Sequence, residues 1–139
     1  MKNLKISQKA IDIFKNVAIS NYKNGDEIET LAYFLGKEEH KCIEITTIVF
    51  PDQKGTATYV DDEGIEGQDS IQWMLTNLVQ KKDLCLVLWV HCHVKGAPCG
   101  FSSVDIHTQY LLEYNIPSIK GLVIEMDSNT IKTLSLIHI

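Results

Sequence analysis

Side chains able to do chemistry gather in one short stretch of the chain, Trp89 to Asp105, which reads WVHCHVKGAPCGFSSVD. His91 and His93 lie two positions apart at the end of an apolar run that predicts a strand. Because successive strand side chains alternate between faces, both rings should point the same way. Two imidazoles on one face are a favourable start for a zinc site.

A catalytic zinc ion also needs a third protein ligand and an open position for water. Asp105 is the natural candidate, because it lies in the first turn of the next expected helix, and the intervening loop contains glycine and proline and can fold back over the strand end. Bound zinc lowers the pKa of water toward ~7 and so supplies hydroxide at neutral pH. The pattern therefore predicts a hydrolytic site of two histidines, one aspartate and water.

Each part of this stretch also has a purely structural explanation. Ser102 and Asp105 have the S-x-x-D spacing of a helix capping box, and an H-x-H pair can be two surface or core histidines. Taken singly these explanations are the more common ones, but the order of strand, loop and capped helix favours the metal site. Cys92 should face away from the histidines and pack as a small hydrophobe. Cys99 lies on the loop, at a spacing from Cys92 that is not a common zinc pattern.

The elements that must position these residues follow from hydrophobic periodicity and turn signals. We expect three helices and five or six strands, forming an α/β domain with a mixed sheet. The first helix is expected to run from Ser7, its N-cap, to Gly25, and the other two are expected over 68–82 and 102–115. The strands are expected over 29–37, 40–50, 83–93, 119–126 and 130–139. A turn at the residues DSN should join the last two strands. The strands over 29–37 and 40–50 should pair antiparallel, and the strand over 83–93 should be central, since it is almost continuously apolar.

Residues 52–70 form a polar, acidic segment, which we expect to be a long loop with a brief strand at Thr56–Val60. A loop of this length in a small domain is more often functional than idle.

The composition is that of one compact domain, residues 1–139, with 45% hydrophobic and 22% charged residues. A net charge of −5 argues against nucleic acid as a partner. No apolar run approaches the ~18–20 residues of a membrane span, and the N-terminus does not look like a signal peptide. We therefore expect a cytoplasmic location and reduced thiols at the four cysteines, Cys42, Cys85, Cys92 and Cys99.

The order H-x-H, short loop and S-x-x-D, with a glutamate on an earlier strand, resembles the JAMM motif of MPN+ metalloproteases. Within that group WVHCH…FSSVDIHTQ is most similar to the AMSH branch of deubiquitinases, and IETLAYFLGK is similar to the family's ETCGILCGK. The likeness runs from about Glu29 to the end of the chain. It implies the MPN fold, a cytidine-deaminase-like three-layer α/β fold whose mixed, mainly antiparallel sheet is flanked by helices.

The resemblance also implies roles for five residues of this chain. His91, His93 and Asp105 match the ligands of one catalytic Zn²⁺. Glu29 matches the general base that moves a proton from the zinc-bound water to the leaving amine; its structural alternative is a solvated charge at a strand start. Ser102 matches the serine that supports the oxyanion, which leaves Ser103 for the helix cap.

Two departures from the family pattern concern the metal sites. The loop Val94–Phe101 is one residue longer than usual and starts with valine where proline is common, which a loop should absorb without moving the ligands. In the AMSH branch a second, structural zinc is bound by the histidine matching His107 together with residues of a later insertion. The sequence reaches Ile139 without that insertion, so we expect no second zinc, with His107 an ordinary helix residue and His138 a strand residue.

The function implied is a zinc-dependent isopeptidase that hydrolyses polyubiquitin chains, of the extended, open linkage type preferred by the AMSH branch. Residues 56–82 correspond to an insertion that meets the distal ubiquitin, whose tail would lie beside residues 52–60. The resemblance also allows the cytoplasmic protein to associate with endosomes through partner proteins. The alternatives are a non-catalytic MPN scaffold that binds ubiquitin or partner subunits, and a JAMM peptidase acting on another ubiquitin-like protein. The five intact motif positions argue against the scaffold.

Overall fold

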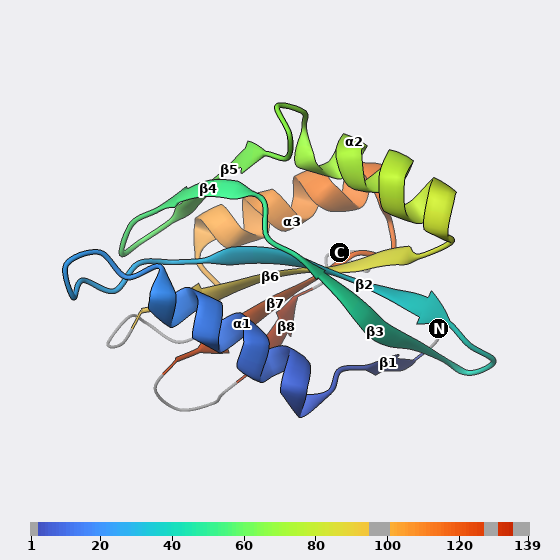
Figure 1. Ribbon diagram of the computed structural model, residues 1–139, viewed down its shortest axis with the longest axis horizontal. Coiled ribbons are helices and arrows are strands. Elements are labelled where there is room, and N and C mark those ends of the chain that lie inside the picture. Colours follow the sequence, from blue (N-terminus) through green and yellow to red (C-terminus); the bar gives the residue numbers. More distant parts are fainter. Residues whose placement is uncertain (1–2, 95–100, 127–130, 135–139) are drawn as a thin grey trace.

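A curled six-stranded sheet forms the middle of the molecule (Figure 1). The computed structural model describes residues 3–94, 101–126 and 131–134. The strand order is β1-β3-β2-β6-β7-β8. In that order the strands are β1 Asn3–Lys5, β3 Cys42–Val49, β2 Leu31–Glu38, β6 Cys85–His93, β7 Lys120–Glu125 and β8 Ile131–Leu134.

The pairing of these strands confirms the predicted mixed, mainly antiparallel sheet. The β2–β3, β2–β6 and β7–β8 pairs are antiparallel, whereas β1–β3 and β6–β7 are parallel. β6 is an inner strand, as its apolar sequence predicts, and it is buried along almost its whole length. The short edge strand β1 was not expected from the sequence.

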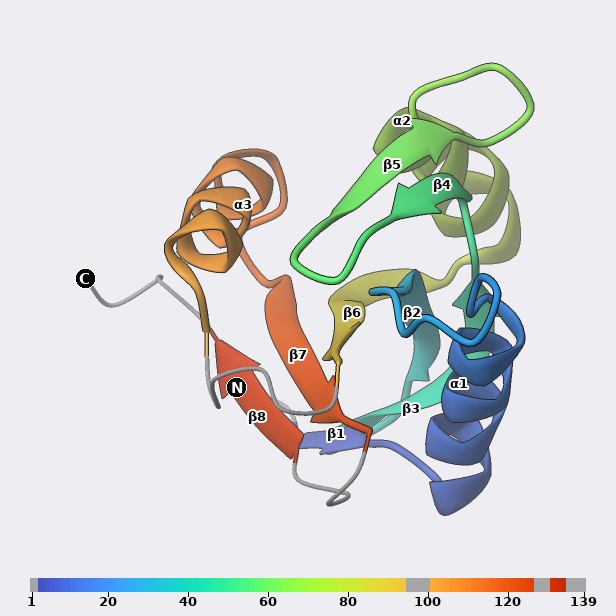
Figure 2. The same ribbon diagram turned by 90° about the vertical axis from the view of Figure 1, so that its left-hand side faces the viewer.

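Helices cover both faces of the sheet, which confirms the three-layer α/β fold. Helix α1, Gln8–Ser20, packs with Val90 and Cys92 of β6 in one apolar cluster. A second cluster joins Trp89 of β6 to the other two helical segments, α2 (Ser70–Met74, continued as the π-helix Leu75–Gln80) and α3 (Ser103–Asn115). Figure 2 shows α1 and α3 on opposite sides of the curled sheet. Residues of β6 that alternate with Val90 and Cys92 therefore face α2 and α3.

Helix α1 begins where the sequence predicts, but it ends earlier. The Ser7 side chain accepts a hydrogen bond from the Ala10 N–H at 3.1 Å and so caps the helix. The helix ends at Ser20, not near Gly25. Gly25 lies instead in a tight turn closed by hydrogen bonds between Lys23 and Asp26, where its φ of +81° suits a residue without a Cβ.

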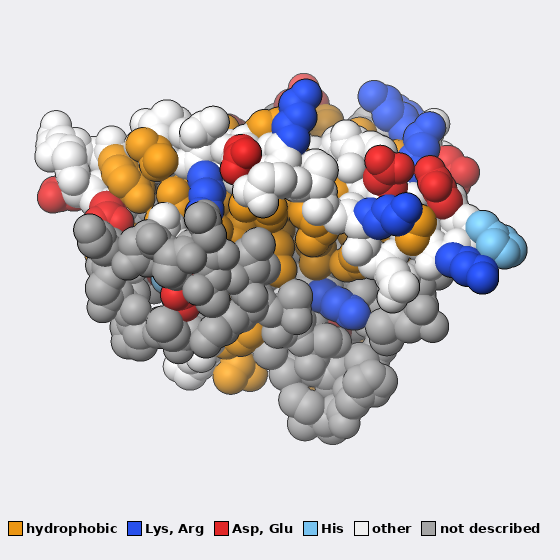
Figure 3. Space-filling view, turned by 90° about the horizontal axis from the view of Figure 1, so that it is seen from below, with side chains coloured by type: hydrophobic (Ala, Val, Ile, Leu, Met, Phe, Trp, Pro, Cys, Tyr) orange, Lys and Arg blue, Asp and Glu red, His pale blue; other side chains and the backbone are white. Residues whose placement is uncertain are grey.

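Lysines and acidic side chains are interspersed on the face of the molecule seen from below (Figure 3). Among the described residues, no helix is both long enough and apolar enough to cross a membrane.

The acidic segment after β3 is a hairpin, so the predicted brief strand at Thr56–Val60 is wrong. Its strands are β4, Asp52–Gly55, and β5, Val60–Gly64, which pair antiparallel in a sheet of their own. Residues 56–59 form the turn, closed by a hydrogen bond from the Thr56 N–H to the Tyr59 carbonyl at 2.8 Å. The acidic side chains of β5 hide its strand character from a sequence-based prediction, because Asp and Glu are depleted in strands.

This hairpin is fastened to the segment that leads into β2. The Glu29 N–H donates to the Thr56 carbonyl at 2.8 Å. Gln53 accepts a hydrogen bond from the Leu31 N–H at 2.8 Å and donates one to the Leu31 carbonyl at 3.0 Å. A Cβ on Gly55 would lie 2.1 Å from the Glu29 carbonyl oxygen, so only glycine permits this approach. The hairpin thus fixes the backbone position of Glu29.

Replacing Gly55 with alanine is expected to push the hairpin away from Glu29. The clash is with backbone, so it should lower the free energy of unfolding by about 1–3 kcal/mol, as overpacking does. Amide hydrogen exchange should then show loss of protection at Glu29 and Leu31. Gly67→Ala is the control for general destabilisation: an added Cβ there meets nothing within 4 Å, but its φ of +76° strains alanine by about 1 kcal/mol, so it should lose stability without losing protection at Glu29. Unchanged protection at Glu29 in Gly55→Ala would contradict this account of the hairpin.

Candidate metal centre

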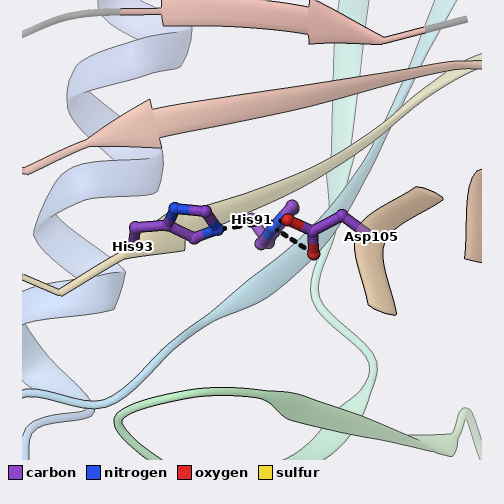
Figure 4. Close-up of side chains that lie close together, drawn as sticks. All are labelled: His91, His93 and Asp105. Carbon is purple, nitrogen blue, oxygen red and sulfur yellow. Dashed lines mark hydrogen bonds and ion pairs between the residues drawn. The ribbon is translucent and has the colours of Figure 1, made fainter. Parts of the chain in front are cut away.

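His91, His93 and Asp105 converge between β6 and α3 (Figure 4). His91 Nε2 lies 2.9 Å from Asp105 Oδ1, and His93 Nε2 lies 3.2 Å from Asp105 Oδ2. All three residues are buried, and one candidate ligand atom from each lies within 4.8 Å of the others. A single carboxylate therefore faces both imidazoles.

Local structure explains why these side chains meet. His91 and His93 share the face of β6 that Trp89 occupies, while Cys92 packs on the α1 side. Asp105 sits in the first turn of α3, where a capping box orients it. The Ser102 hydroxyl accepts from the Asp105 N–H at 3.1 Å, and Asp105 Oδ2 accepts from the Ser102 N–H at 2.9 Å. The structural and the metal explanations of S-x-x-D are therefore compatible.

The helix cap is Ser102, so the assignment of this role to Ser103 is wrong. A serine hydroxyl has one proton to donate and two lone pairs to accept with. Because the cap uses Ser102 only as an acceptor, its proton stays available for an oxygen outside the helix. Ser102 is exposed, so a substrate can reach it.

The donor set and the state of His91 fit a metal ion. His91 is 1% exposed, and neither of its ring nitrogens has a hydrogen-bond partner among the described residues. Its 2.9 Å approach to Asp105 is thus a close contact without hydrogen-bond geometry. Leaving a buried polar atom unsatisfied is costly, and coordination through Nε2 would relieve this cost at that nitrogen. Two imidazoles and one carboxylate are ligands that suit zinc, so the group could bind a metal.

The charge state of Asp105 also suits a ligand. Burial alone would raise the pKa of this carboxyl, but contacts with His91 and then His93 outweigh it and hold the pKa well below its usual range. Asp105 is therefore ionised at neutral pH, as a carboxylate ligand must be.

Glu29 lies beside this group and is buried, so it is not the solvated charge of the structural alternative. Leu31 of β2 pairs with His91 of β6. At the next position, the Cys92 N–H donates to the Thr30 carbonyl, and the Thr30 N–H donates to the Cys92 sulfur. Continuing that register brings Glu29 opposite His93. Burial raises the pKa of Glu29 to about 7, with His93 opposing and Asp105 adding to the shift. A carboxyl with a pKa near 7 can both take up and release a proton at neutral pH.

Trp89 links a proposed ligand on β6 to helix α3. Its indole stacks on the His91 ring, with ring centroids 4.9 Å apart and planes 2° from parallel. The indole N–H donates to Gln109 of α3 at 2.5 Å. Gln109 was not singled out from the sequence; its place one turn after Asp105 on the same helix was the available signal.

The remaining polar candidates have simpler positions. Cys92 is buried, as predicted, and burial raises the pKa of its thiol to about 11, so it is a poor nucleophile at neutral pH. His107 is exposed on α3. Cys99, most of the loop Val94–Phe101, and His138 lie outside the described residues, and the expectation of no second zinc stays a prediction.

Comparison with known proteins assigns the family. The family model described as "JAB1/Mov34/MPN/PAD-1 ubiquitin protease" matches residues 1–118, a range that contains all five motif residues. AMSH-like ubiquitin thioesterase 2 of Arabidopsis thaliana is 26% identical over 125 residues, covering 89% of this chain and 51% of that protein. AMSH-like protease sst2 of Schizosaccharomyces pombe is 29% identical over 118 residues, covering 85% and 25%.

A probable ubiquitin thioesterase of Dictyostelium discoideum is 30% identical over 116 residues, covering 84% of this chain and 15% of that protein. The chain thus spans about half, or less, of the length of these relatives. The match over most of the chain, and the AMSH-like relatives, agree with the resemblance seen in the motif. The chain belongs to the JAB1/Mov34/MPN/PAD-1 ubiquitin protease family, within which it resembles the AMSH-like proteins.

Proposed function

We propose that this protein is a zinc-dependent isopeptidase that hydrolyses polyubiquitin chains. The observation that carries the proposal is the buried group His91, His93 and Asp105, with a glutamate of raised pKa beside it. A metallohydrolase needs a metal-activated water and a base of suitable pKa. Two histidines and an aspartate are of the types that bind such a metal, and a glutamate is of the type that acts as the base. The AMSH-like names of the relatives support ubiquitin conjugates as the substrate class.

In this proposal His91, His93 and Asp105 hold the ion. Zinc bound there would lower the pKa of a coordinated water and polarise the scissile carbonyl. Glu29 takes the proton from the attacking water and delivers it to the leaving lysine amine. Ser102, whose hydroxyl proton is not used by the helix cap, donates a hydrogen bond to the developing oxyanion.

The β4–β5 hairpin is the proposed place for the extended tail of the substrate. Among the described residues β4 pairs only with β5, so its other edge can accept a further strand. A cavity of about 130 Å³ lies between the hairpin and the segment that leads into β2, and it is lined by Glu29, Gln53 and Gly55 together with Asn21, Lys23 and Ile28. A narrow tail on β4 would therefore end beside the proposed base. A preference for the extended, open linkage type remains part of the proposal.

The purified protein is expected to contain about one zinc ion per chain. Asp105→Ala and His93→Ala should lose it after dialysis, as measured by elemental analysis, because each removes a ligand. His107→Ala is the matched control and should retain zinc, since His107 is exposed on α3. Full zinc affinity in Asp105→Ala would contradict the ligand set.

Zinc-loaded protein is expected to cleave at least one member of a panel of diubiquitins of different linkage, and a chelator should stop it. Glu29→Gln should slow cleavage by at least about 100-fold while keeping zinc, because it removes only the proton carrier. Glu44→Gln, an exposed glutamate on β3, should leave the rate unchanged. Zinc-loaded protein that cleaves no diubiquitin would point to the scaffold or to another ubiquitin-like substrate.

The raised pKa of Glu29 predicts a pH-dependent stability difference in metal-free protein. Below pH 4.5, the ordinary value, Glu29 is neutral in both folded and unfolded chains. As pH rises toward 7 the unfolded chain ionises first, so the wild type loses stability relative to Glu29→Gln. Chemical denaturation in chelator should therefore show the advantage of Glu29→Gln growing between pH 5 and about 7, then levelling. A stability difference between Glu29→Gln and the wild type that does not change with pH would refute the raised pKa of Glu29.

A further inference from the structure

We propose that Gln109 is a positioning residue for the metal centre: it holds the Trp89 indole, which in turn sets the ring plane of His91. The inference rests on the proposed function, since it takes His91 to be a metal ligand. It assigns a role to a buried amide whose side-chain hydrogen bonds go to Trp89, Glu113 and Ile119 and not to a proposed ligand.

Both polar atoms of the Gln109 side chain have hydrogen-bond partners. It is 0% exposed on α3, one turn beyond Asp105. Its Oε1 accepts from the Trp89 Nε1–H at 2.5 Å, and its Nε2 donates to Glu113 Oε1 at 2.6 Å and to the Ile119 carbonyl at 2.9 Å. The indole can only donate and the carbonyl can only accept, so the amide has one orientation that satisfies all of its partners.

The Trp89 ring is held on its edge and over its face. Gln109 fixes the N–H edge, while His91 lies parallel to the indole. Gly121 of β7, the register partner of Trp89, provides the space for the ring, because a Cβ there would come within 2.9 Å of three indole atoms. The indole therefore has little freedom to tilt.

His91 needs such an external guide. A metal-bound histidine is ordinarily oriented by a hydrogen bond from its second ring nitrogen. His91 Nδ1 has no such partner among the described residues, and the second torsion of histidine is intrinsically broad. Stacking on a fixed Trp89 replaces the missing hydrogen bond.

The same amide also connects the two elements that supply the proposed ligands. Gln109 and Asp105 stand on α3, while Trp89 and His91 stand on β6. The hydrogen bond from Trp89 to Gln109 therefore fixes the helix against the strand close to the metal centre. A hydrophobic residue of equal size would fill the same volume but could not fix the position of α3 against β6 by a hydrogen bond.

The test measures zinc affinity by competition with a chelator in Gln109→Met, Trp89→Phe and the double variant. Each single variant should weaken zinc binding about tenfold, the lower end of the range for residues behind metal ligands. Because both remove the same hydrogen bond, the double variant should be no weaker than the worse single one. The visible absorption spectrum of the Co²⁺-loaded protein should shift in each, which reports altered ligand geometry directly.

Trp73→Phe is the matched control. Trp73 also donates its indole N–H, to Glu66 at 2.9 Å, but it lies on α2, which supplies none of the proposed ligands. Its zinc affinity and cobalt spectrum should equal those of the wild type. Denaturation of the metal-free variants separates general loss of stability from loss of ligand geometry.

The outcomes separate this inference from the function beneath it. Wild-type zinc affinity in both single variants, or fully additive losses in the double variant, would overturn the role of Gln109 and leave the proposed function standing. A wild-type protein that binds no zinc would overturn the proposed function itself. If Gln109→Met fails to fold, the affinity and spectrum of Trp89→Phe decide.

Discussion

The Asp105 carboxylate is the group on which the arrangement of the site depends. One oxygen completes the capping box with the Ser102 N–H and lies 3.2 Å from His93, and the other lies 2.9 Å from His91. The start of α3 and the end of β6 are thereby joined through one side chain. Any change that moves the helix start also moves the carboxylate, so helix capping and proposed metal binding constrain each other.

The fold surrounds this polar group with rigid, well-packed supports. β6 is buried on both faces and presents both histidines on one of them. The β4–β5 hairpin fixes the backbone of Glu29 through Thr56 and Gln53. Unsatisfied polar atoms in a buried cluster of this kind are costly, and neither ring nitrogen of His91 has a hydrogen-bond partner among the described residues. A cation bound by His91, His93 and Asp105 would satisfy His91 Nε2, so the folding energetics are compatible with the proposed metal chemistry.

The sequence predicts well what short-range patterns determine. The two-residue alternation on β6 is enough to set His91 and His93 on one face and Cys92 on the other, and S-x-x-D marks the start of α3. The importance of Glu29, some sixty positions earlier, follows only from the family resemblance, because no local pattern distinguishes it from a surface charge. The cap at Ser102 is visible in the same S-x-x-D spacing, whereas the attachment of the β4–β5 hairpin to Glu29 and the contact of Trp89 with Gln109 depend on which distant segments meet. Local propensity does not contain that information.

The central claim is that one zinc ion sits between β6 and α3, and anomalous scattering at the zinc edge from crystals of the zinc-loaded protein tests it most directly. The account predicts a single strong peak within about 2.0–2.2 Å of His91 Nε2, His93 Nε2 and an Asp105 oxygen, with Glu29 facing the open coordination position. A zinc-loaded crystal with no peak between these three residues, or with its zinc held by other side chains, would contradict it.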